Sequence, residues 1–274
     1  MLQLKPYSGK LGALVEGIDL RQSIDSEGLK ELNDALLKYE VLFFRNQSIS
    51  PEHHAQLASL FGGSQLHGAY GHVEGYPQIT ILENDRDNPS KIELWHTDMT
   101  FRSCPPLGSI LHSVISPEKG GDTMFASMSA AFDALSPSMQ DFLCNLTAIH
   151  DFSYGFKESL EEPGGRERLA SMVLENPPVE HPVVRTHPES GKKGLFVNRL
   201  FTRQIKELTS KESNNLLEFL FDHVTKDEFT CRFSWQENSI AFWDNRITQH
   251  KPVNDYWPQH RKMQRITIDG DRPF

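Results

Sequence analysis

The sequence predicts a mainly β protein with helical inserts (α+β), in which many short strands form a β-sandwich or jelly-roll core. Three observations lead to this fold class. Strand-like segments dominate the chain from residue 78 onwards, and helical segments stand between them. The 274 residues include 38% hydrophobic and 10% aromatic residues, which suffice for a sizeable core. No internal repeat or low-complexity linker divides the chain, so we expect a single domain over residues 1–274.

The first third of the chain mixes both kinds of element. Residues 11–20 are typical of a strand punctuated by glycine. A helix is expected from Ser26, as its N-cap, to about Tyr39, because apolar residues recur there on one stripe. Residues 41–47 then predict a buried strand. Ser50 as N-cap and Pro51 at the first position predict a helix that ends at Gly62–Gly63.

The remaining elements alternate along the chain. Strands are expected at residues 78–84, 108–115, 122–127, 181–187, 194–198, 228–235, 239–244 and 263–269. Helices are expected at residues 128–135, 137–144, 167–174 and 209–224, and the last opens with Thr-Ser-Lys-Glu, a capping-box pattern.

Charge and cysteine content narrow the function. The formal net charge of -9 argues against nucleic acid and membranes as partners, since both select basic faces, but allows a small anionic ligand. The three cysteines, Cys104, Cys144 and Cys231, form no CxxC pair, so we expect reduced thiols in a cytoplasmic protein. The start of the chain has no apolar signal region, and no run of eighteen apolar residues predicts a membrane span.

A His-x-Asp pattern in ELWHTDMTF is the first candidate for chemistry. In an extended strand His96 and Asp98 would point to the same face and could chelate one divalent metal. His250 is a candidate second histidine ligand after a strand-like run. Two histidines and one aspartate match the facial triad of non-haem Fe(II) oxygenases, whereas zinc usually prefers a tetrahedral site. The ligand set does not decide between these metals, and the alternatives are a surface His–Asp pair and a solvated loop histidine.

Two arginines near the end of the chain could bind anions. Arg261 and Arg265 are four residues apart and share one face of a strand. A guanidinium matches a carboxylate or a sulfonate and does not lose its charge. The alternative is a pair of surface arginines beside acidic neighbours.

Four blocks carry a family resemblance: WHTD (95–98), GGDT (120–123), WDNRITQH (243–250) and the tail at 260–274. They resemble the Fe(II)/2-oxoglutarate dioxygenases of the taurine dioxygenase (TauD/TfdA) family, and residues 12–20, 41–50, 67–75 and 176–198 are also similar to it. The resemblance covers nearly the whole chain. It implies a double-stranded β-helix (jelly-roll) core, Fe(II), and 2-oxoglutarate and O2 as cosubstrates.

The resemblance also implies roles for individual residues. His96, Asp98 and His250 would be the iron ligands. Arg261 would pair with the distal carboxylate of 2-oxoglutarate, and the hydroxyl of Thr123 would add a hydrogen bond to it. From the residues alone, Thr123 would be a turn residue after Gly120–Gly121.

Within the family, the chain is similar to the taurine-type branch, which implies a substrate pocket. His67, Arg265 and the backbone N–H of Met99 would hold a sulfonate. Tyr70, Phe156 and Phe201 would form the pocket wall. The alternatives are a core histidine and ordinary core aromatic residues.

The sequence departs from the taurine pattern where that pattern holds the substrate amine. Ile92 stands at the position of an asparagine, and Gly155 at the position of a serine. A buried ammonium without partners costs several kcal/mol. We therefore expect poor use of taurine, or a preference for a sulfonate without the amine, although Tyr70 could still serve an amine.

The implied reaction is hydroxylation of the carbon next to a sulfonate, that of taurine or a related alkanesulfonate, with release of sulfite, an aldehyde, succinate and CO2. The same chemistry on a carboxylate of the aryloxyalkanoate type, or on a sulfate ester, is the alternative. A zinc hydrolase and a cupin-like binding module are rivals from other classes. Family members are commonly dimers or tetramers, so a homodimer or homotetramer is expected.

Overall fold

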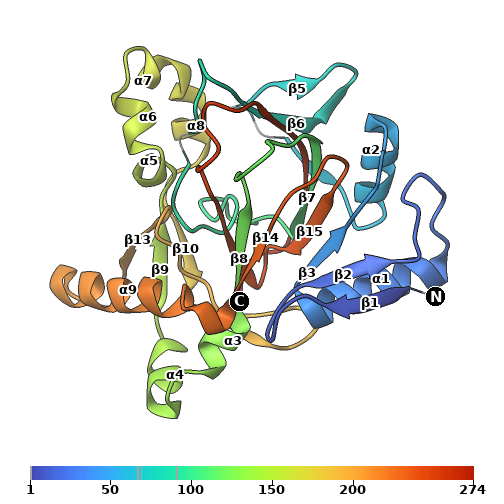
Figure 1. Cartoon of the computed structure of the whole chain (residues 1–274). Helices are drawn as coiled ribbons and strands as arrows, with labels where there is room; N and C mark the ends of the chain where they lie inside the picture. Colours follow the sequence, from blue (N-terminus) through green and yellow to red (C-terminus); the bar gives the residue numbers. More distant parts are fainter. Residues whose placement is uncertain (1, 67, 69, 91) are drawn as a thin grey trace.

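The computed structural model describes residues 2–66, 68, 70–90 and 92–274. Its centre is a large, almost wholly antiparallel sheet that faces a smaller one (Figure 1). The large sheet has the order β1 (Gln3–Pro6), β2 (Ala13–Glu16), β3 (Val41–Phe44), β15 (Ile240–Asp244), β7 (Gly108–Ile115), β17 (Arg261–Ile268), β6 (Tyr76–Asn84) and β5 (His72–Val73), with β4 (Ser64–Gln65) also paired to β17. The smaller sheet has the order β14 (Thr230–Phe233), β8 (Thr123–Ser127) and β16 (Thr248–Pro252).

Two short sheets and the helices complete the chain. One sheet joins β10 (Val179–Pro182), β9 (Thr147–His150) and β13 (Thr202–Ile205), and the other joins β11 (Val184–Thr186) and β12 (Lys193–Leu195). The helices are α1 (Ser26–Tyr39), α2 (Pro51–Ser59), α3 (Met128–Asp133), α4 (Pro137–Leu143), α5 (Phe152–Gly155), α6 (Lys157–Glu161), α7 (Gly165–Arg168), α8 (Ala170–Glu175) and α9 (Ser210–Val224), with a 3-10 turn at Asp227–Phe229.

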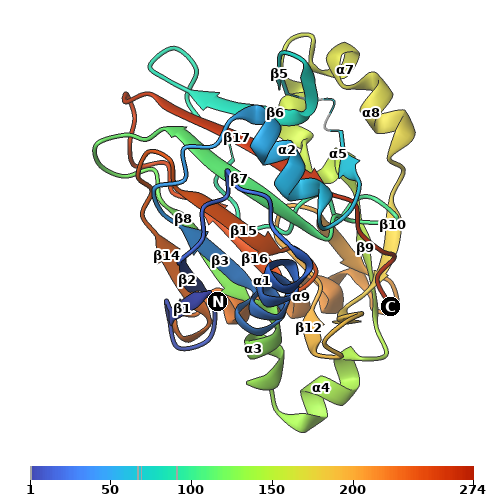
Figure 2. The same ribbon diagram turned by 90° about the vertical axis from the view of Figure 1, so that its right-hand side faces the viewer.

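The central strands of the large sheet, such as β3, β15 and β7, are buried on both faces. Helices α1 and α2 cover its outer face (Figure 2), where Leu36 and Leu57 pack against strand residues such as Phe242. Its inner face packs against the smaller sheet through a second cluster, which includes Phe43, Phe125, Phe233, Trp235, Trp243 and Met263. Because strand side chains alternate between faces, the inward side chains of the two sheets meet in one buried layer, most of which is apolar. The mainly β fold with helical inserts is confirmed.

Several expected elements differ in detail. The first long helix is capped by Asp25, not Ser26, because the Asp25 side chain accepts a hydrogen bond from the Gly28 N–H. The strand expected at 41–47 ends at Phe44, and the one expected at 181–187 is divided between β10 and β11 at Val183. The helix expected at 167–174 is divided between α7 and α8. Helices α5 and α6 and strands β1, β4, β5, β9, β13 and β16 were not predicted.

The expectation that His96 and Asp98 lie on an extended strand is wrong. His96 makes an isolated bridge with His250, and Asp98 begins a turn. Met99 follows with a φ of 50°, a left-handed conformation that is uncommon outside glycine. The turn places both side chains on one side without a strand.

The sequence also led to expectations about membrane spans and cysteines. Among the described residues, no helix has the length and apolar character needed to cross a bilayer. Cys104, Cys144 and Cys231 are free thiols.

The buried His54 of α2 gives a test of stability. Its Nε2–H donates to the Ile110 carbonyl (3.1 Å), and burial, reinforced by His112, lowers its pKa to about 3. The unfolded chain should protonate His54 near pH 6.5, so its contribution destabilises the fold progressively as the pH falls from about 6.5 towards 3. The free energy of unfolding should therefore drop by about 1.4 kcal/mol per pH unit from this group alone in that window.

Denaturant unfolding of the wild type and of His54→Gln between pH 7 and 4 would measure this effect. Glutamine can still donate to the Ile110 carbonyl but cannot be protonated. The stability difference between the two proteins should move in favour of the variant as the pH falls, and parallel pH profiles would contradict the expectation.

Candidate metal centre and its surroundings

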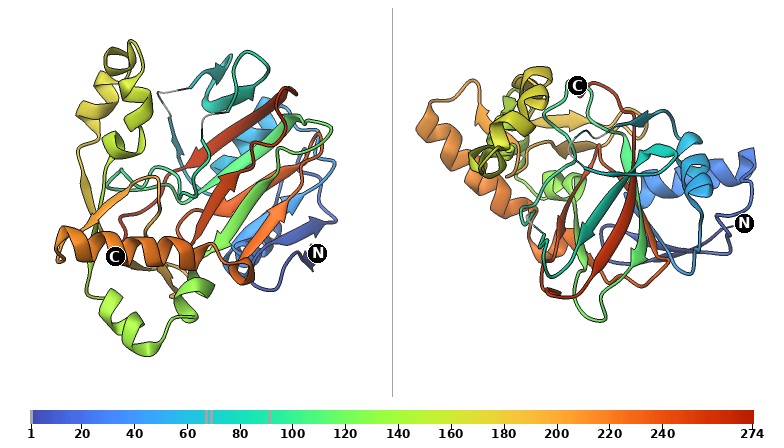
Figure 3. Two further views of the ribbon diagram at one scale, coloured as in Figure 1. Left: turned by 60° about the vertical axis from the view of Figure 1, so that its left-hand side comes forward. Right: turned by 90° about the horizontal axis from the view of Figure 1, so that it is seen from above.

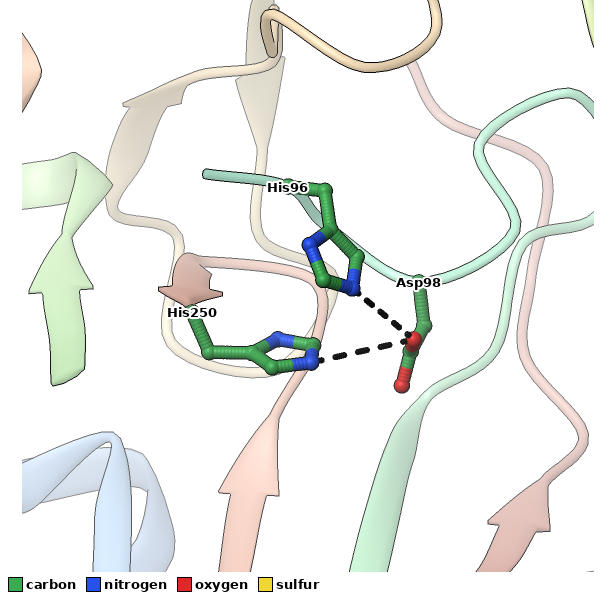
Figure 4. Close-up of side chains that lie close together, drawn as sticks. All are labelled: His96, Asp98 and His250. Atoms are coloured by element: carbon green, nitrogen blue, oxygen red, sulfur yellow. Dashed lines mark ion pairs between the residues drawn. The ribbon is translucent and has the colours of Figure 1, made fainter. Parts of the chain in front are cut away.

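Three side chains converge at one end of the space between the two main sheets. The Nε2 atoms of His96 and His250 lie 3.7 and 3.8 Å from Asp98 Oδ1, as Figure 4 shows. Potential ligand atoms of the three residues all lie within 4.8 Å of one another, and all three residues are buried. The predicted set of two histidines and one aspartate is therefore assembled in space.

Backbone pairing brings the two histidines together. The His96 N–H donates to the His250 carbonyl (3.0 Å), and the His250 N–H donates to the His96 carbonyl (2.8 Å). His250 lies on β16, opposite Phe125 of β8. Residues directly opposite in an antiparallel pair point to the same face, so the His250 ring faces the apolar interior.

Asp98 is held on both its backbone and its side chain. The Asn245 carboxamide accepts from the Asp98 N–H (2.8 Å) and donates to the Asp98 carbonyl (3.0 Å). Ser109 of β7 donates its hydroxyl to Asp98 Oδ2 (3.0 Å), which leaves Oδ1 towards the imidazoles. His96 Nδ1 lies 2.9 Å from the Leu94 carbonyl. A carbonyl only accepts, so this contact puts the ring proton on Nδ1 and leaves the Nε2 lone pair towards Asp98.

The protonation states suit a divalent metal. Burial lowers the pKa of both imidazoles, to about 3 for His250. Burial opposes ionisation of Asp98, but Arg265 and the two histidines hold its pKa below the usual range. Two neutral imidazoles and one carboxylate are the forms that bind metal, and three donors on one side fit a facial site for Fe(II).

The two predicted anion-binding arginines face the interior. Arg261, Met263 and Arg265 stand two residues apart along β17, so their side chains lie on one face of the strand. Met263 belongs to the inner apolar cluster, so this is the inward face. Arg265 Nη1 donates to Asp98 Oδ1 (3.1 Å), so this cation reaches the metal centre directly. Arg261 is also buried, and its Nε has no hydrogen-bond partner in the part of the chain that the structure describes. A buried guanidinium with an unused donor favours an anionic ligand.

Thr123 is not a turn residue. It begins β8, is 3% exposed, and its Oγ1 accepts a hydrogen bond from Trp235 Nε1 (2.9 Å). The preceding turn touches Arg261: a Cβ on Gly121 would lie 3.3 Å from Arg261 Cδ. Thr123 and Arg261 therefore lie in one neighbourhood, and their joint binding of one carboxylate stays a prediction.

An apolar wall adjoins the metal centre. Met99, Phe101, Phe152 and Phe201 form a buried cluster, against which Phe156 packs. Part of this wall comes from α5, which stands with α6, α7 and α8 on the side away from the N-terminal strands (Figure 3). Phe156 and Phe201 lie together in this wall, with ring centroids 6.2 Å apart, and their contact with a substrate stays a prediction.

Gly155 and Ile92 are the two positions where the sequence departs from the taurine pattern. A Cβ on Gly155 would lie 2.4 Å from Phe201 Cδ1, so the phenyl ring fills the space of a side chain there. Ile92 is half-buried, and its carbonyl accepts a hydrogen bond from Asn254 Nδ2 (2.8 Å).

Tyr70 and Met99 are the other predicted substrate residues that the structure describes. Burial raises the pKa of the Tyr70 hydroxyl, and Arg265 and Asp98 also act on it, which places Tyr70 near the metal centre. The Met99 N–H has no acceptor among the described residues. His67 lies outside the described residues.

A separate surface groove of about 650 Å³ lies over α5 to α8. Its lining residues include Lys157, Leu160, Arg166 and Val173, and none of the predicted site residues. Across residues 2–66, 68, 70–90 and 92–274, the group of side chains placed to hold a metal is His96, Asp98 and His250, so the chemistry points to this buried centre.

Residues 3–267 match the family model described as taurine catabolism dioxygenase TauD, TfdA family. The chain belongs to this family. It is 38% identical to an alkylsulfatase of Acinetobacter baylyi over 98% of this chain and 86% of that protein. It is 35% identical to an alpha-ketoglutarate-dependent sulfate ester dioxygenase of Pseudomonas putida over 99% of this chain and 91% of that protein.

A crystal structure of a putative alpha-ketoglutarate-dependent taurine dioxygenase from Burkholderia xenovorans superposes with a TM-score of 0.87. That protein is 36% identical, and the match covers 100% of this chain and 94% of the other. The predicted family, the jelly-roll fold class and the class of 2-oxoglutarate-dependent dioxygenases are confirmed.

Three residues around the TauD/TfdA-type centre were missed from the sequence: Ser109, Trp235 and Asn245. Asn245 lies inside the WDNRITQH block, so its place in the motif was a signal that could have drawn attention to it. Ser109 and Trp235 belong to none of the motifs. Ser109 lies 11 residues from Asp98 and Trp235 lies 112 residues from Thr123, and only the fold brings each pair into contact.

Ser109→Ala should weaken metal binding. Without its hydroxyl, Asp98 Oδ2 loses a hydrogen bond that orients the carboxylate, and loss of such a bond typically costs at least about tenfold in metal affinity. Titration of the protein with Mn(II) in the absence of oxygen would measure the change. Ser113→Ala is the matched control, since Ser113 is a buried serine on the same face of β7 whose hydroxyl contacts Ser116 (2.6 Å). Equal losses in both variants would contradict a role for Ser109 at the metal.

Proposed function

We propose that this family member uses Fe(II), 2-oxoglutarate and O2 to hydroxylate the carbon next to the sulfonate of an alkanesulfonate. The observation that carries the proposal is the contact of Arg265 with Asp98 Oδ1 at 3.1 Å, because it sets a permanent cation at the edge of the candidate metal centre. An anionic substrate group bound by Arg265 would hold its neighbouring carbon close to the metal. The products would be an aldehyde, sulfite, succinate and CO2.

The proposed roles follow from the donor set. His96, Asp98 and His250 would hold Fe(II), and Arg261 with Thr123 would hold the distal carboxylate of 2-oxoglutarate. When bound, Fe(II) supplies the redox chemistry that couples decarboxylation of 2-oxoglutarate to hydroxylation of a C–H bond. The chain itself binds, orients and excludes water.

The substrate would be oriented by hydrogen-bond donors that bind its anionic group and by the aromatic wall. Arg265 would bind the sulfonate, and the Met99 N–H, which has no acceptor among the described residues, would donate to it. His67 stays a predicted partner of the same anion. The aromatic wall of Phe101, Phe156 and Phe201 would keep bulk water from the reacting carbon.

The substrate is proposed to lack an amine. The ring of Phe201 fills the space beside Gly155, and Ile92 supplies no polar side chain. An ammonium against this wall would lose water and gain no partner from Gly155 or Ile92, although Tyr70 could still serve it. An alkyl chain would gain contact with the phenyl rings instead.

A sulfate ester is the second candidate, and it is supported by the names of the two relatives from Acinetobacter baylyi and Pseudomonas putida. Hydroxylation of the carbon that bears the ester oxygen would release an aldehyde and sulfate in place of sulfite. A carboxylate of the aryloxyalkanoate type would also fit Arg265. A cytoplasmic location and a homodimer or homotetramer stay predictions; the free thiols support a reducing compartment.

A substrate panel tests the reaction. Succinate release with Fe(II), 2-oxoglutarate and air would be measured with taurine, a short alkanesulfonate, an alkyl sulfate and an aryloxyacetate, with sulfite and sulfate read in parallel. We expect succinate coupled to sulfite, with the amine-free sulfonate used better than taurine. Sulfate release from the alkyl sulfate as the best reaction would favour the second candidate. Coupling to the aryloxyacetate alone would refute both sulfur substrates.

Substitution of Arg261 should weaken mainly the binding of 2-oxoglutarate, and substitution of Arg265 mainly that of the sulfonate. Arg261→Ala should raise the 2-oxoglutarate concentration needed for half-maximal rate by about 10- to 100-fold, since it removes a charge-assisted bond. Arg265→Ala should do the same for the sulfonate. Steady-state kinetics with each ligand varied in turn would measure both, and the reverse pattern would mean that the roles are exchanged.

A further inference from the structure

Trp235 is a buried residue that contacts the candidate cosubstrate site through Thr123. It follows β14, is 6% exposed, and meets Phe233 edge-on with ring centroids 4.9 Å apart. It belongs to the same inner apolar cluster as Phe125 and Met263. Its one polar atom, Nε1, donates to Thr123 Oγ1 at 2.9 Å.

This bond has only one possible direction. An indole N–H can donate but cannot accept, so the Thr123 oxygen must be the acceptor. The hydroxyl hydrogen of Thr123 is then left to donate elsewhere. Within the described residues, Trp235 is the only hydrogen-bond partner of this hydroxyl. A buried hydroxyl that donates to nothing is costly, so the arrangement favours an acceptor supplied by a ligand.

The hydroxyl belongs to the interior of the jelly roll. Thr123 and Phe125 are two apart on β8 and share a face, and the strand partner of Phe125 is His250. The turn before Thr123 packs against Arg261 through Gly121, which has a φ of 70° and no room for a side chain beside Pro117 (2.8 Å). A donor hydrogen and a buried guanidinium thus lie together on the inner side of the two sheets.

We propose that Trp235 is a positioning residue for the cosubstrate: by donating to Thr123, it directs the Thr123 hydroxyl to donate to the distal carboxylate. This inference rests on the proposed function, which assigns that carboxylate to Arg261 and Thr123. A hydroxyl that accepts one hydrogen bond also becomes a stronger donor in another, so the effect of Trp235 passes through Thr123. Trp235 itself does not touch the ligand.

Trp235→Phe tests the role, because it keeps most of the ring and removes the N–H. The dissociation constant of 2-oxoglutarate would be measured by calorimetry on protein loaded with Mn(II), without oxygen, so that no turnover is needed. We expect the variant to bind 2-oxoglutarate about fivefold more weakly, as for the loss of one ordinary hydrogen bond. Its affinity for Mn(II) should be unchanged.

A double-mutant cycle with Thr123→Val separates this role from core packing. Valine keeps the shape of threonine but has no hydroxyl, so Trp235→Phe should cause no further loss of 2-oxoglutarate affinity in that background. An equal loss in both backgrounds, or no loss in either, would overturn the proposal. Loss of Mn(II) affinity in Trp235→Phe would also overturn it, because the effect would then be a general disturbance of the core.

A shorter cosubstrate gives an independent check. 2-Oxobutanoate keeps the 2-oxo acid but has no distal carboxylate, so its affinity should be the same for the wild type and Trp235→Phe. A fivefold loss with this compound would overturn the inference while leaving the proposed function standing. Failure of the wild-type Mn(II) protein to bind 2-oxoglutarate at all would instead refute the proposed function, and the inference with it.

Discussion

The reciprocal backbone bridge between His96 and His250 is the constraint on which the site depends. It joins a turn early in the chain to a strand near its end, and Asn245 reinforces it by binding both sides of the Asp98 backbone. A metal binds more tightly where its ligands are already ordered, since ordering them on binding would cost affinity. Two main-chain hydrogen bonds and one carboxamide provide that order. The left-handed Met99 then turns the chain away from the metal and leaves its N–H unused by the described residues.

Side chains that alternate along a strand point to opposite faces of the sheet, so each strand contributes to both the outer packing and the inner site. Outward positions of the large sheet pack under α1 and α2, while inward positions carry the apolar cluster and, at one end, the polar groups. Met263 separates Arg261 from Arg265 along β17, so one strand can serve two anions at different places. The same rule puts Ser109 behind Asp98 and Thr123 near Arg261. Catalytic geometry here follows from strand register, which a shift of one residue would destroy.

Much of this arrangement could be predicted from the sequence, but not the hydrogen bonds that support it. The ligand residues and arginines were found because their motifs or spacing are local. The predicted strand for His96 and Asp98 was wrong because an i, i+2 pair can share a side in a turn as well as in a strand. Ser109 and Trp235 were missed because neither belongs to a motif, and only the fold brings them to Asp98 and Thr123, which lie 11 and 112 residues away along the chain. The contact of Gly155 with Phe201 was equally invisible, since close packing leaves no pattern in one chain.

Charge explains why such a buried site should select anions. Arg265 pairs with Asp98, and Arg261 is buried near Asp122, whose Oδ2 already pairs with Arg232 (2.6 Å). A divalent metal would leave the two arginines and the metal with three more positive charges than Asp98 neutralises. Burying that excess is costly unless ligands balance it. Doubly charged 2-oxoglutarate and a singly charged sulfonate or sulfate ester would balance it together, whereas a zwitterion such as taurine would add a cation against the apolar wall. The charge balance and the aromatic wall therefore favour the same amine-free substrate for different physical reasons.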